Sequence, residues 1–292
     1  MDLRSIGIGL LFALIWASAF SSARIIVADA APLTSLAARF LLSGLIGVAI
    51  ARALGESWRL TRGQWRATIV FGLCQNAVYL GLNFVAMQTV EASLASIIAS
   101  TMPLMVAAAG WAVFGDRLPW FGALGLVLGL VGVTVIMSAR MGGGMDPYGV
   151  ALCLIGAAAL AVATLSMRGA SSGGNLMMVV GLQMLVGAAA LAVTSLVVED
   201  IYVRPSVPWV LAFLYTTLAP GLLATWLWFT LVERIGAVRA ATFHFLTPFF
   251  GVAIAALLLG EALGPRDILG VAIIMAGILA VQLSKQKTVS KA

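Results

Sequence analysis

The sequence predicts an all-α polytopic membrane protein whose ten transmembrane helices form two inverted five-helix repeats. Three observations lead to this fold class. Of the 292 residues, 62% are hydrophobic and only 10% are charged, whereas about 25% are charged in soluble domains. Ten stretches are long and apolar enough to cross a bilayer. The most apolar parts of the chain also repeat once, 145 positions later and without a gap.

Each predicted span holds roughly 20 mostly apolar residues, the length that a helix needs to cross the hydrocarbon core. The ten spans cover residues 4–27, 33–54, 65–87, 93–114, 119–139, 147–168, 175–198, 207–231, 237–259 and 266–284. They take up most of the chain, so we expect no separate soluble domain. The first span has no evident small-residue cleavage site and nine spans follow it, which indicates an uncleaved helix and not a secretory signal.

The repeat is carried by prolines, glycines and an acidic residue. The matched pairs are Met102-Pro103 with Thr247-Pro248, Gly115-Asp116 with Gly260-Glu261, Gly125 with Gly270, and Gly132 with Gly277. Because each copy holds five spans, an odd number, the second copy enters the membrane from the opposite side. Inverted repeats are the plan of many secondary transporters, with the substrate site near the midplane between the copies. We expect a first repeat, a linker, a second repeat and a cytoplasmic tail at residues 1–140, 141–146, 147–284 and 285–292.

Polar side chains gather on the helices of the first half. Asn76, Tyr79 and Asn83 share one face of the third helix, and Ser96 and Ser100 share one face of the fourth. Polar groups at bilayer depth are costly unless they face the bundle or a wet cavity. These five residues are therefore predicted to bind a substrate. For the serines, the alternative is a hydrogen bond to a backbone carbonyl of a helix.

Aromatic and ionisable residues extend the predicted cavity. Trp16 on the first helix and Trp226 on the eighth lie deep enough to offer ring faces to a substrate, with core packing as the alternative. His244 is the only histidine and is expected to assist binding; a proton carrier and a plainly packed ring are the other interpretations. Arg39, two turns inside the second helix, either snorkels to the interface or attracts a carboxylate at the outer mouth.

Pro103 and Pro248 occupy equivalent places about midway along the fourth and ninth helices. Proline in a helix interior removes a backbone hydrogen bond and kinks the helix. Two kinks related by the repeat are predicted gating elements, and a purely shape-fitting role is equally compatible with the pattern.

Glycines line one face of the fifth helix and one face of the tenth. Small residues at this spacing let helix backbones approach closely in lipid. The contact they predict is either within one chain or between two chains, so monomer and homodimer both stay open. Cys74 and Cys153 fit neither a metal-ligand spacing nor a disulfide framework. We therefore expect no metal, no cofactor and no catalytic residues, since an enzyme site needs convergent reactive side chains.

The positive charges predict the orientation in the membrane. With a cytoplasmic N-terminus, twelve of the 17 Lys and Arg residues fall on the cytoplasmic side and four on the other. Positive residues near span ends favour the cytoplasm, so both termini are expected there. The net charge of +6 is spread over short loops. It lacks the cluster expected for nucleic-acid binding, so the expected partners are the lipid bilayer and a small-molecule substrate.

Several of these segments resemble the drug/metabolite transporter superfamily, specifically its bacterial EamA-type members. The pieces that carry the resemblance are residues 13–20 (ALIWASAF), 38–40 (ARF), 91–96 (EASLAS) leading to Pro103, 114–118 (FGDRL), and the second-half segment from Gly236 through Pro248 to 259–263 (LGEAL). The resemblance covers essentially the whole chain. Asp116 is a departure, because the family usually has Glu at this junction.

The resemblance implies a ten-helix carrier of the bacterial inner membrane that exports small metabolites through a central cavity between its halves. Exporters of neutral and aromatic amino acids form a large part of this group, and an uncharged cavity that mixes rings, amides and hydroxyls suits such a cargo. Relatives also move purines, sugar conjugates and cationic drugs, so these cargoes stay open, as does a passive channel. We expect a secondary carrier that works by alternating access.

Overall fold

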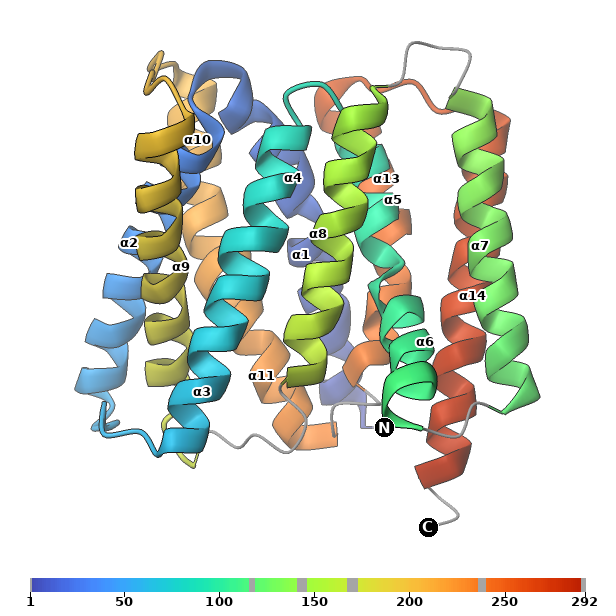
Figure 1. The fold of residues 1–292 in the computed structure, drawn as a ribbon, viewed down its shortest axis with the longest axis horizontal. Coiled ribbons are helices and arrows are strands. Elements are labelled where there is room, and N and C mark those ends of the chain that lie inside the picture. Colours follow the sequence, from blue (N-terminus) through green and yellow to red (C-terminus); the bar gives the residue numbers. More distant parts are fainter. Residues whose placement is uncertain (1, 116–118, 141–145, 167–172, 236–239, 290–292) are drawn as a thin grey trace.

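The computed structural model describes residues 2–115, 119–140, 146–166, 173–235 and 240–289. Helices run up and down the bundle, and both termini lie at the same end (Figure 1). In the described part of the chain, nine helical stretches are long and apolar enough to cross a membrane, and a tenth, Phe243–Leu259, is shorter. The predicted class, an all-α polytopic membrane protein, is confirmed.

The first half makes five passes. Its elements are α1 (Leu3–Asp29), α2 (Pro32–Ala53), α3 (Arg62–Phe71), η1 (Gly72–Tyr79), α4 (Leu80–Ala86), α5 (Ala92–Ser100), α6 (Met102–Phe114) and α7 (Trp120–Arg140). The third pass is α3, η1 and α4 in one continuous run, where η1 is a π-helix. The fourth pass is α5 and α6, with a break at Thr101.

The second half repeats this plan. Its elements are α8 (Pro147–Ser166), α9 (Leu176–Val198), α10 (Val207–Thr216), η2 (Thr217–Leu223), α11 (Ala224–Ile235), η3 (Ala241–Leu246), α13 (Thr247–Leu259) and α14 (Pro265–Val289). The π-helices η1 and η2 begin 145 residues apart, and so do α6 and α13. The repeat therefore extends to the irregular backbone of the third and fourth passes of each half.

The two halves are inverted. In Figure 1, α1 rises from the end that holds both termini, whereas α8, the first helix of the second half, descends from the opposite end. The α14 helix continues past Ser284 to Val289 because no helix breaker lies in this stretch, and Lys and Gln are good helix formers. Asp116, the predicted linker residues 141–145 and the last residues 290–292 lie outside the described part of the chain.

Local signals in the sequence explain several helix ends. The Thr61 hydroxyl accepts from the Gln64 amide while the Gln64 side chain accepts from the Thr61 amide, a capping box that starts α3. The helices α6 and α13 end at Gly115 and Gly260, with φ of 66° and 67°. Only glycine adopts this left-handed conformation without strain, so the repeat preserves it in both copies.

The two most extensive helix contacts both join the halves. The α2 helix packs along α9, and α7 packs along α14. In the second pair the backbones nearly touch: a Cβ atom on Gly277 would lie 2.7 Å from the Gly125 carbonyl oxygen, and one on Gly132 would lie 2.8 Å from the Gly270 carbonyl oxygen. The predicted glycine faces therefore meet inside one chain, and a contact between two chains is not needed to explain them.

Carboxylates tie α2 and α9 together at both ends. Glu199, just after α9, accepts from the amides of Leu33 and Thr34 at the start of α2, at 2.7 and 2.9 Å. Glu56, just after α2, accepts from the amide of Met178 at the start of α9, at 2.7 Å. Each helix start thus receives a negative charge from the other half, and such charges stabilise the positive end of a helix dipole.

We expect Glu199→Gln to lower the free energy of unfolding by about 1–2 kcal/mol, because it removes a charged cap from two backbone amides. The measurement is the thermal unfolding of the detergent-solubilised protein. Asp200→Asn is the matched control, since Asp200 is exposed and has no interaction in the described part of the chain. Equal effects of the two substitutions would contradict the prediction.

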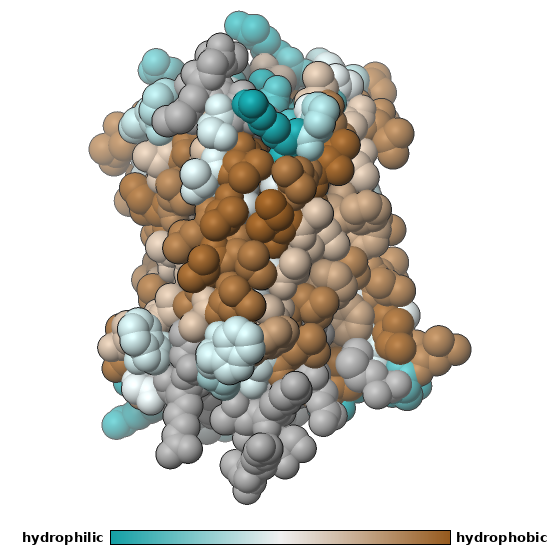
Figure 2. Space-filling view, turned by 90° about the vertical axis from the view of Figure 1, so that its right-hand side faces the viewer, coloured by the Kyte–Doolittle hydropathy of each residue, from teal (hydrophilic) through white to brown (hydrophobic). Residues whose placement is uncertain are grey.

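The outer surface is suited to lipid. Figure 2 shows the face that carries α7 and α14, where a hydrophobic band lies between more polar ends. Large apolar side chains are exposed in this band, including Val127, Leu130 and Leu269 at 56%, 70% and 56%. A band of this kind is stable only in hydrocarbon, so it faces the bilayer.

Candidate functional site

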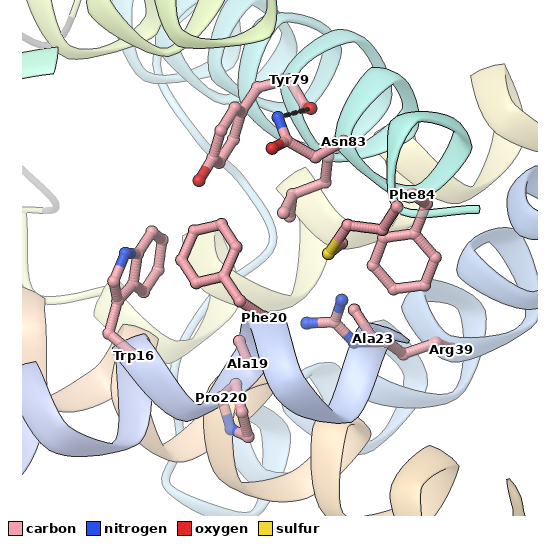
Figure 3. A pocket seen from close by; sticks show the side chains of 11 residues that line it. Trp16, Ala19, Phe20, Ala23, Arg39, Tyr79, Asn83, Phe84 and Pro220 are labelled. Atoms are coloured by element: carbon pink, nitrogen blue, oxygen red, sulfur yellow. Dashed lines mark hydrogen bonds between the residues drawn. The ribbon is translucent and has the colours of Figure 1, made fainter. Parts of the chain in front are cut away.

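A small pocket lies inside the bundle between α1, α2, the third pass and η2. We call it the inner pocket, and its volume is about 30 Å³. Its lining residues are Trp16, Ala19, Phe20, Ala23, Arg39, Tyr79, Leu80, Asn83, Phe84, Met87 and Pro220. Trp16, at the middle of α1, lies at one side of the pocket, and Pro220 brings the second half to its wall (Figure 3). The space holds one or two water molecules, so a metabolite needs a wider form of the same pocket.

Tyr79 and Asn83 enter the inner pocket from the third pass. Both are buried, and the Asn83 side-chain amide donates to the Tyr79 carbonyl oxygen at 2.8 Å (Figure 3). This bond leaves the Asn83 Oδ1 atom buried without a partner in the described part of the chain. The Tyr79 hydroxyl also has no hydrogen bond there. The pocket therefore offers an amide acceptor and a hydroxyl to a ligand.

Asn76 faces a different neighbour. Its side-chain amide donates to the Gln183 carbonyl oxygen of α9 at 3.0 Å, and it does not line the inner pocket. Regular α-helical spacing would put Asn76, Tyr79 and Asn83 on one face. The π-helix η1 covers Gly72–Tyr79, and its wider turn rotates Asn76 away from the other two.

The two serines also bond to backbone. The Ser96 hydroxyl donates to the Thr247 carbonyl oxygen of α13 at 3.3 Å, and the Ser100 hydroxyl donates to the Ile97 carbonyl oxygen at 2.6 Å. Neither serine lines the inner pocket. The alternative of backbone bonding thus describes their contacts, and Ser96 connects the two halves.

Trp16 joins the inner pocket to an aromatic cluster around His244. The buried His244 ring stands edge-on to Phe12, Trp16 and Trp228, with centroid distances of 5.2, 6.0 and 4.9 Å. The His244 side chain makes no hydrogen bond in the described part of the chain. Trp226 is 41% exposed and makes no ring contact there, whereas Trp228 packs against Phe12 and His244.

Pro103 and Pro248 lie directly after the interruptions of the fourth and ninth passes. Each stands in the first turn of a new helix, α6 or α13, where a missing amide costs no hydrogen bond. Both prolines are buried, and neither lines the inner pocket. The breaks are therefore in the backbone as expected, while a gating role stays a prediction.

Arg39 is buried and reaches the inner pocket. Only 4% of the residue is exposed, so the snorkelling interpretation is wrong. Its Nε donates to the Thr216 carbonyl oxygen at 3.1 Å, next to the π-helix η2. Its guanidinium carbon lies 4.8 Å from the centroid of the Phe40 ring, a favourable cation–π contact. No acidic side chain is among the lining residues, so the pocket carries a net positive charge.

A second, larger cavity opens at the end opposite the termini. This outer vestibule has a volume of about 600 Å³ and is lined by residues that include Asp29, Glu91 and Glu261. Glu261 belongs to the second half and caps α5 by accepting from the amides of Ala92 and Ser93, at 2.8 and 3.0 Å. The vestibule is therefore rimmed by carboxylates, one of which holds the halves together.

One hydrogen bond connects the linings of the two cavities. Arg24 lines the outer vestibule, Met87 lines the inner pocket, and the Arg24 guanidinium donates to the Met87 carbonyl oxygen. This contact ties α1 to the end of the third pass. Arg24, Met87 and Phe20 belong to the two linings, although the sequence pattern does not indicate them. Arg24 was detectable as one of the few basic residues on that side, whereas Met87 and Phe20 look like ordinary apolar residues.

These observations define the class of protein: a membrane protein of two inverted helical halves with a pocket at their contact, the architecture of many secondary transporters. A model of the EamA-like transporter family matches residues 3–138 and 147–283. The chain belongs to this family, and the resemblance seen in its motifs is confirmed.

Known relatives are similar along most of the chain. The "Uncharacterized transporter YvbV" of Bacillus subtilis is 26% identical over 269 residues, which cover 92% of this chain and 88% of that protein. The "Probable amino-acid metabolite efflux pump" of Salmonella typhimurium is 27% identical over 197 residues, covering 64% and 66% of the two chains. A solved crystal structure at 22% identity has a TM-score of 0.71, covers 98% and 99% of the two chains, and supports the fold.

Proposed function

We propose that this protein is a secondary carrier that exports small metabolites, and neutral or aromatic amino acids in particular, by alternating access. Its setting is the bacterial cytoplasmic membrane, with both termini in the cytoplasm. The observation that carries the proposal is the inner pocket, which combines one cation, an unpaired amide oxygen and a hydroxyl with aromatic rings. A neutral amino acid presents the complementary groups: a carboxylate, an ammonium and an apolar side chain.

The size of the inner pocket favours a carrier over a channel. A passive channel needs a continuous wet path, whereas this pocket has a volume of about 30 Å³, and Met87 of its wall is hydrogen-bonded to Arg24 of the outer vestibule. A carrier exposes its site to one side at a time, so a closed form is part of its cycle. The relative named as an amino-acid metabolite efflux pump also supports the amino-acid assignment.

Transport by purified protein in lipid vesicles tests this function. We expect labelled phenylalanine to enter vesicles preloaded with unlabelled phenylalanine, in a saturable and trans-stimulated way. Tyr79→Phe and Asn83→Leu should each lower the rate by about tenfold, because each removes one hydrogen bond to the substrate. Tyr148→Phe is the control, since Tyr148 is 69% exposed at the start of α8.

The outcomes separate the alternatives. Flux that does not saturate and shows no trans-stimulation would indicate a channel. Saturable flux of a purine, a sugar conjugate or a cationic drug, but of no amino acid, would assign another cargo. Repeating the measurement with and without a pH gradient tells whether protons are coupled. An unchanged rate in both pocket variants would show that the substrate binds elsewhere.

A further inference from the structure

Arg39 is a buried cation whose described surroundings supply no opposite charge. Its partners are the Thr216 carbonyl oxygen at 3.1 Å and the ring face of Phe40, with 4.8 Å between the guanidinium carbon and the ring centroid. A carbonyl dipole and a ring face compensate only part of the desolvation of a buried charge. The strongest compensation available to a guanidinium is a carboxylate bound by two parallel hydrogen bonds.

The geometry leaves the right atoms of Arg39 for such a bond. The hydrogen bond from Nε to Thr216 holds the guanidinium in place, and the two terminal nitrogens have no hydrogen bond in the described part of the chain. In Figure 3 the guanidinium reaches into the space that Phe20, Asn83 and Phe84 enclose. A planar fork of donors that points into a pocket matches the two oxygens of a carboxylate.

The same pocket holds an acceptor for the opposite pole. Asn83 Oδ1 is buried without a hydrogen bond in the described part of the chain, because the amide nitrogen already donates to the Tyr79 carbonyl oxygen. An unpaired buried acceptor is costly, and an ammonium group satisfies it with a charge-assisted hydrogen bond. The rings of Trp16 and Phe20 beside it suit a cation or an apolar side chain.

We infer that Arg39 binds the carboxylate of the transported molecule while Asn83 Oδ1 accepts from its ammonium group. The inner pocket then selects zwitterionic α-amino acids and discriminates against amines that lack the carboxylate. This inference rests on the proposed function and adds the residues that select the substrate. The competing explanation is structural: Arg39, together with Ser43, which donates to the Thr217 carbonyl oxygen at 2.9 Å, holds the start of η2 in place.

Ligand binding to the purified protein in detergent distinguishes the two roles. The shift of the melting temperature with ligand concentration gives a dissociation constant without any need for transport. The probes are phenylalanine, its carboxamide phenylalaninamide, and 3-phenylpropionate, which has the carboxylate but no ammonium. For the wild-type protein we expect phenylalanine to bind about 10- to 100-fold more tightly than phenylalaninamide, the range of a hydrogen bond to a charged group.

The variants then assign the preference. Arg39→Gln should raise the dissociation constant of phenylalanine by about 10- to 100-fold and change that of phenylalaninamide by no more than about threefold. The two ligands should then bind with similar affinity. Arg39→Lys should retain part of the preference, because it keeps the charge but loses the fork. Asn83→Leu should weaken the binding of phenylalanine, which has an ammonium group, but not the binding of 3-phenylpropionate, which has none. A purely structural role of Arg39 predicts an equal loss for the acid and its amide.

Each remaining outcome is decisive. If the wild-type protein binds phenylalanine and its amide equally, the inference is overturned while the proposed function stands. If no amino acid binds or is transported, the panel is repeated with other carboxylates and their amides. If the protein then prefers a carboxylate over its amide and Arg39→Gln abolishes this preference, the Arg39 site is supported. Only the amino-acid cargo is rejected in that case. If Arg39→Gln does not fold, the wild-type preference and Arg39→Lys still test the site.

Discussion

Replacing Gly277 with alanine is expected to lower the free energy of unfolding by about 2–3 kcal/mol, the range of an overpacked contact. The new Cβ atom would lie 2.7 Å from the Gly125 carbonyl oxygen and 2.8 Å from the Gly129 amide nitrogen. Both are backbone atoms of α7 that cannot rotate away as a side chain can. The helices α7 and α14 must therefore separate, and the contact between the halves weakens along its length.

Gly7→Ala provides the control for this substitution. Gly7 lies in α1, and a Cβ atom there meets nothing within 4 Å. Alanine favours a helix over glycine, so this variant should unfold at the same or a slightly higher temperature. The measurement is thermal unfolding in one detergent for both variants. If Gly277→Ala is as stable as Gly7→Ala, the close approach of α7 and α14 does not exist in the folded protein.

Removing the Arg24 side chain is expected to open the inner pocket toward the outer vestibule. Arg24 and Gln88 line the vestibule, Ala23 and Met87 line the pocket, and the bond from Arg24 to the Met87 carbonyl oxygen joins the two linings. A hydrogen bond to a charged group contributes about 1.5–3 kcal/mol, which corresponds to a 10- to 100-fold change in the population of an open form. Arg24→Ala should raise access to the pocket by this factor.

A thiol reagent that does not cross membranes measures this access. The background carries Cys74→Ala and Cys153→Ala, which remove both cysteines, and Ala19→Cys places one thiol in the inner pocket. With both termini in the cytoplasm, as proposed, the rate of labelling from outside the cell should rise about 10- to 100-fold with Arg24→Ala. Arg204→Ala is the control, because Arg204 stacks on Tyr202 at the same end of the bundle, 5.9 Å from its ring centroid. An unchanged rate would show that this contact does not close the pocket.

The membrane fold is the part that local sequence predicts well. Apolar length is a property of each segment taken alone, so the ten spans are visible without knowledge of their neighbours. The matched prolines and glycines also repeat at a constant offset, and the structure places the starts of α6 and α13 at this offset. Even the contact between the glycine faces of α7 and α14 follows from small residues, although only the structure shows that both belong to one chain.

The candidate site is less predictable because it depends on the backbone in the middle of the third pass. The spacing of Asn76, Tyr79 and Asn83 suggests one polar face, yet η1 is a π-helix and Asn76 bonds to the Gln183 carbonyl oxygen instead. A π-helix is rare and occurs as a short interruption of an α-helix, so regular helical spacing does not predict it. Likewise, the acceptor of the Ser96 hydroxyl is Thr247, 151 positions away.

The residue pattern predicts that the chain lies in a bilayer, how many times it crosses it and that its halves are inverted. Hydrophobic length is a property of each segment taken alone, and the inversion follows from the odd number of spans in each repeat. Which polar groups reach the inner pocket depends instead on contacts between helices that are far apart in the sequence. These contacts place Arg39 inside the bundle against Thr216, and they turn Ser96 and Asn76 toward other helices. The reason is physical: a buried polar group goes where a partner satisfies it, and those partners lie more than 100 positions away along the chain.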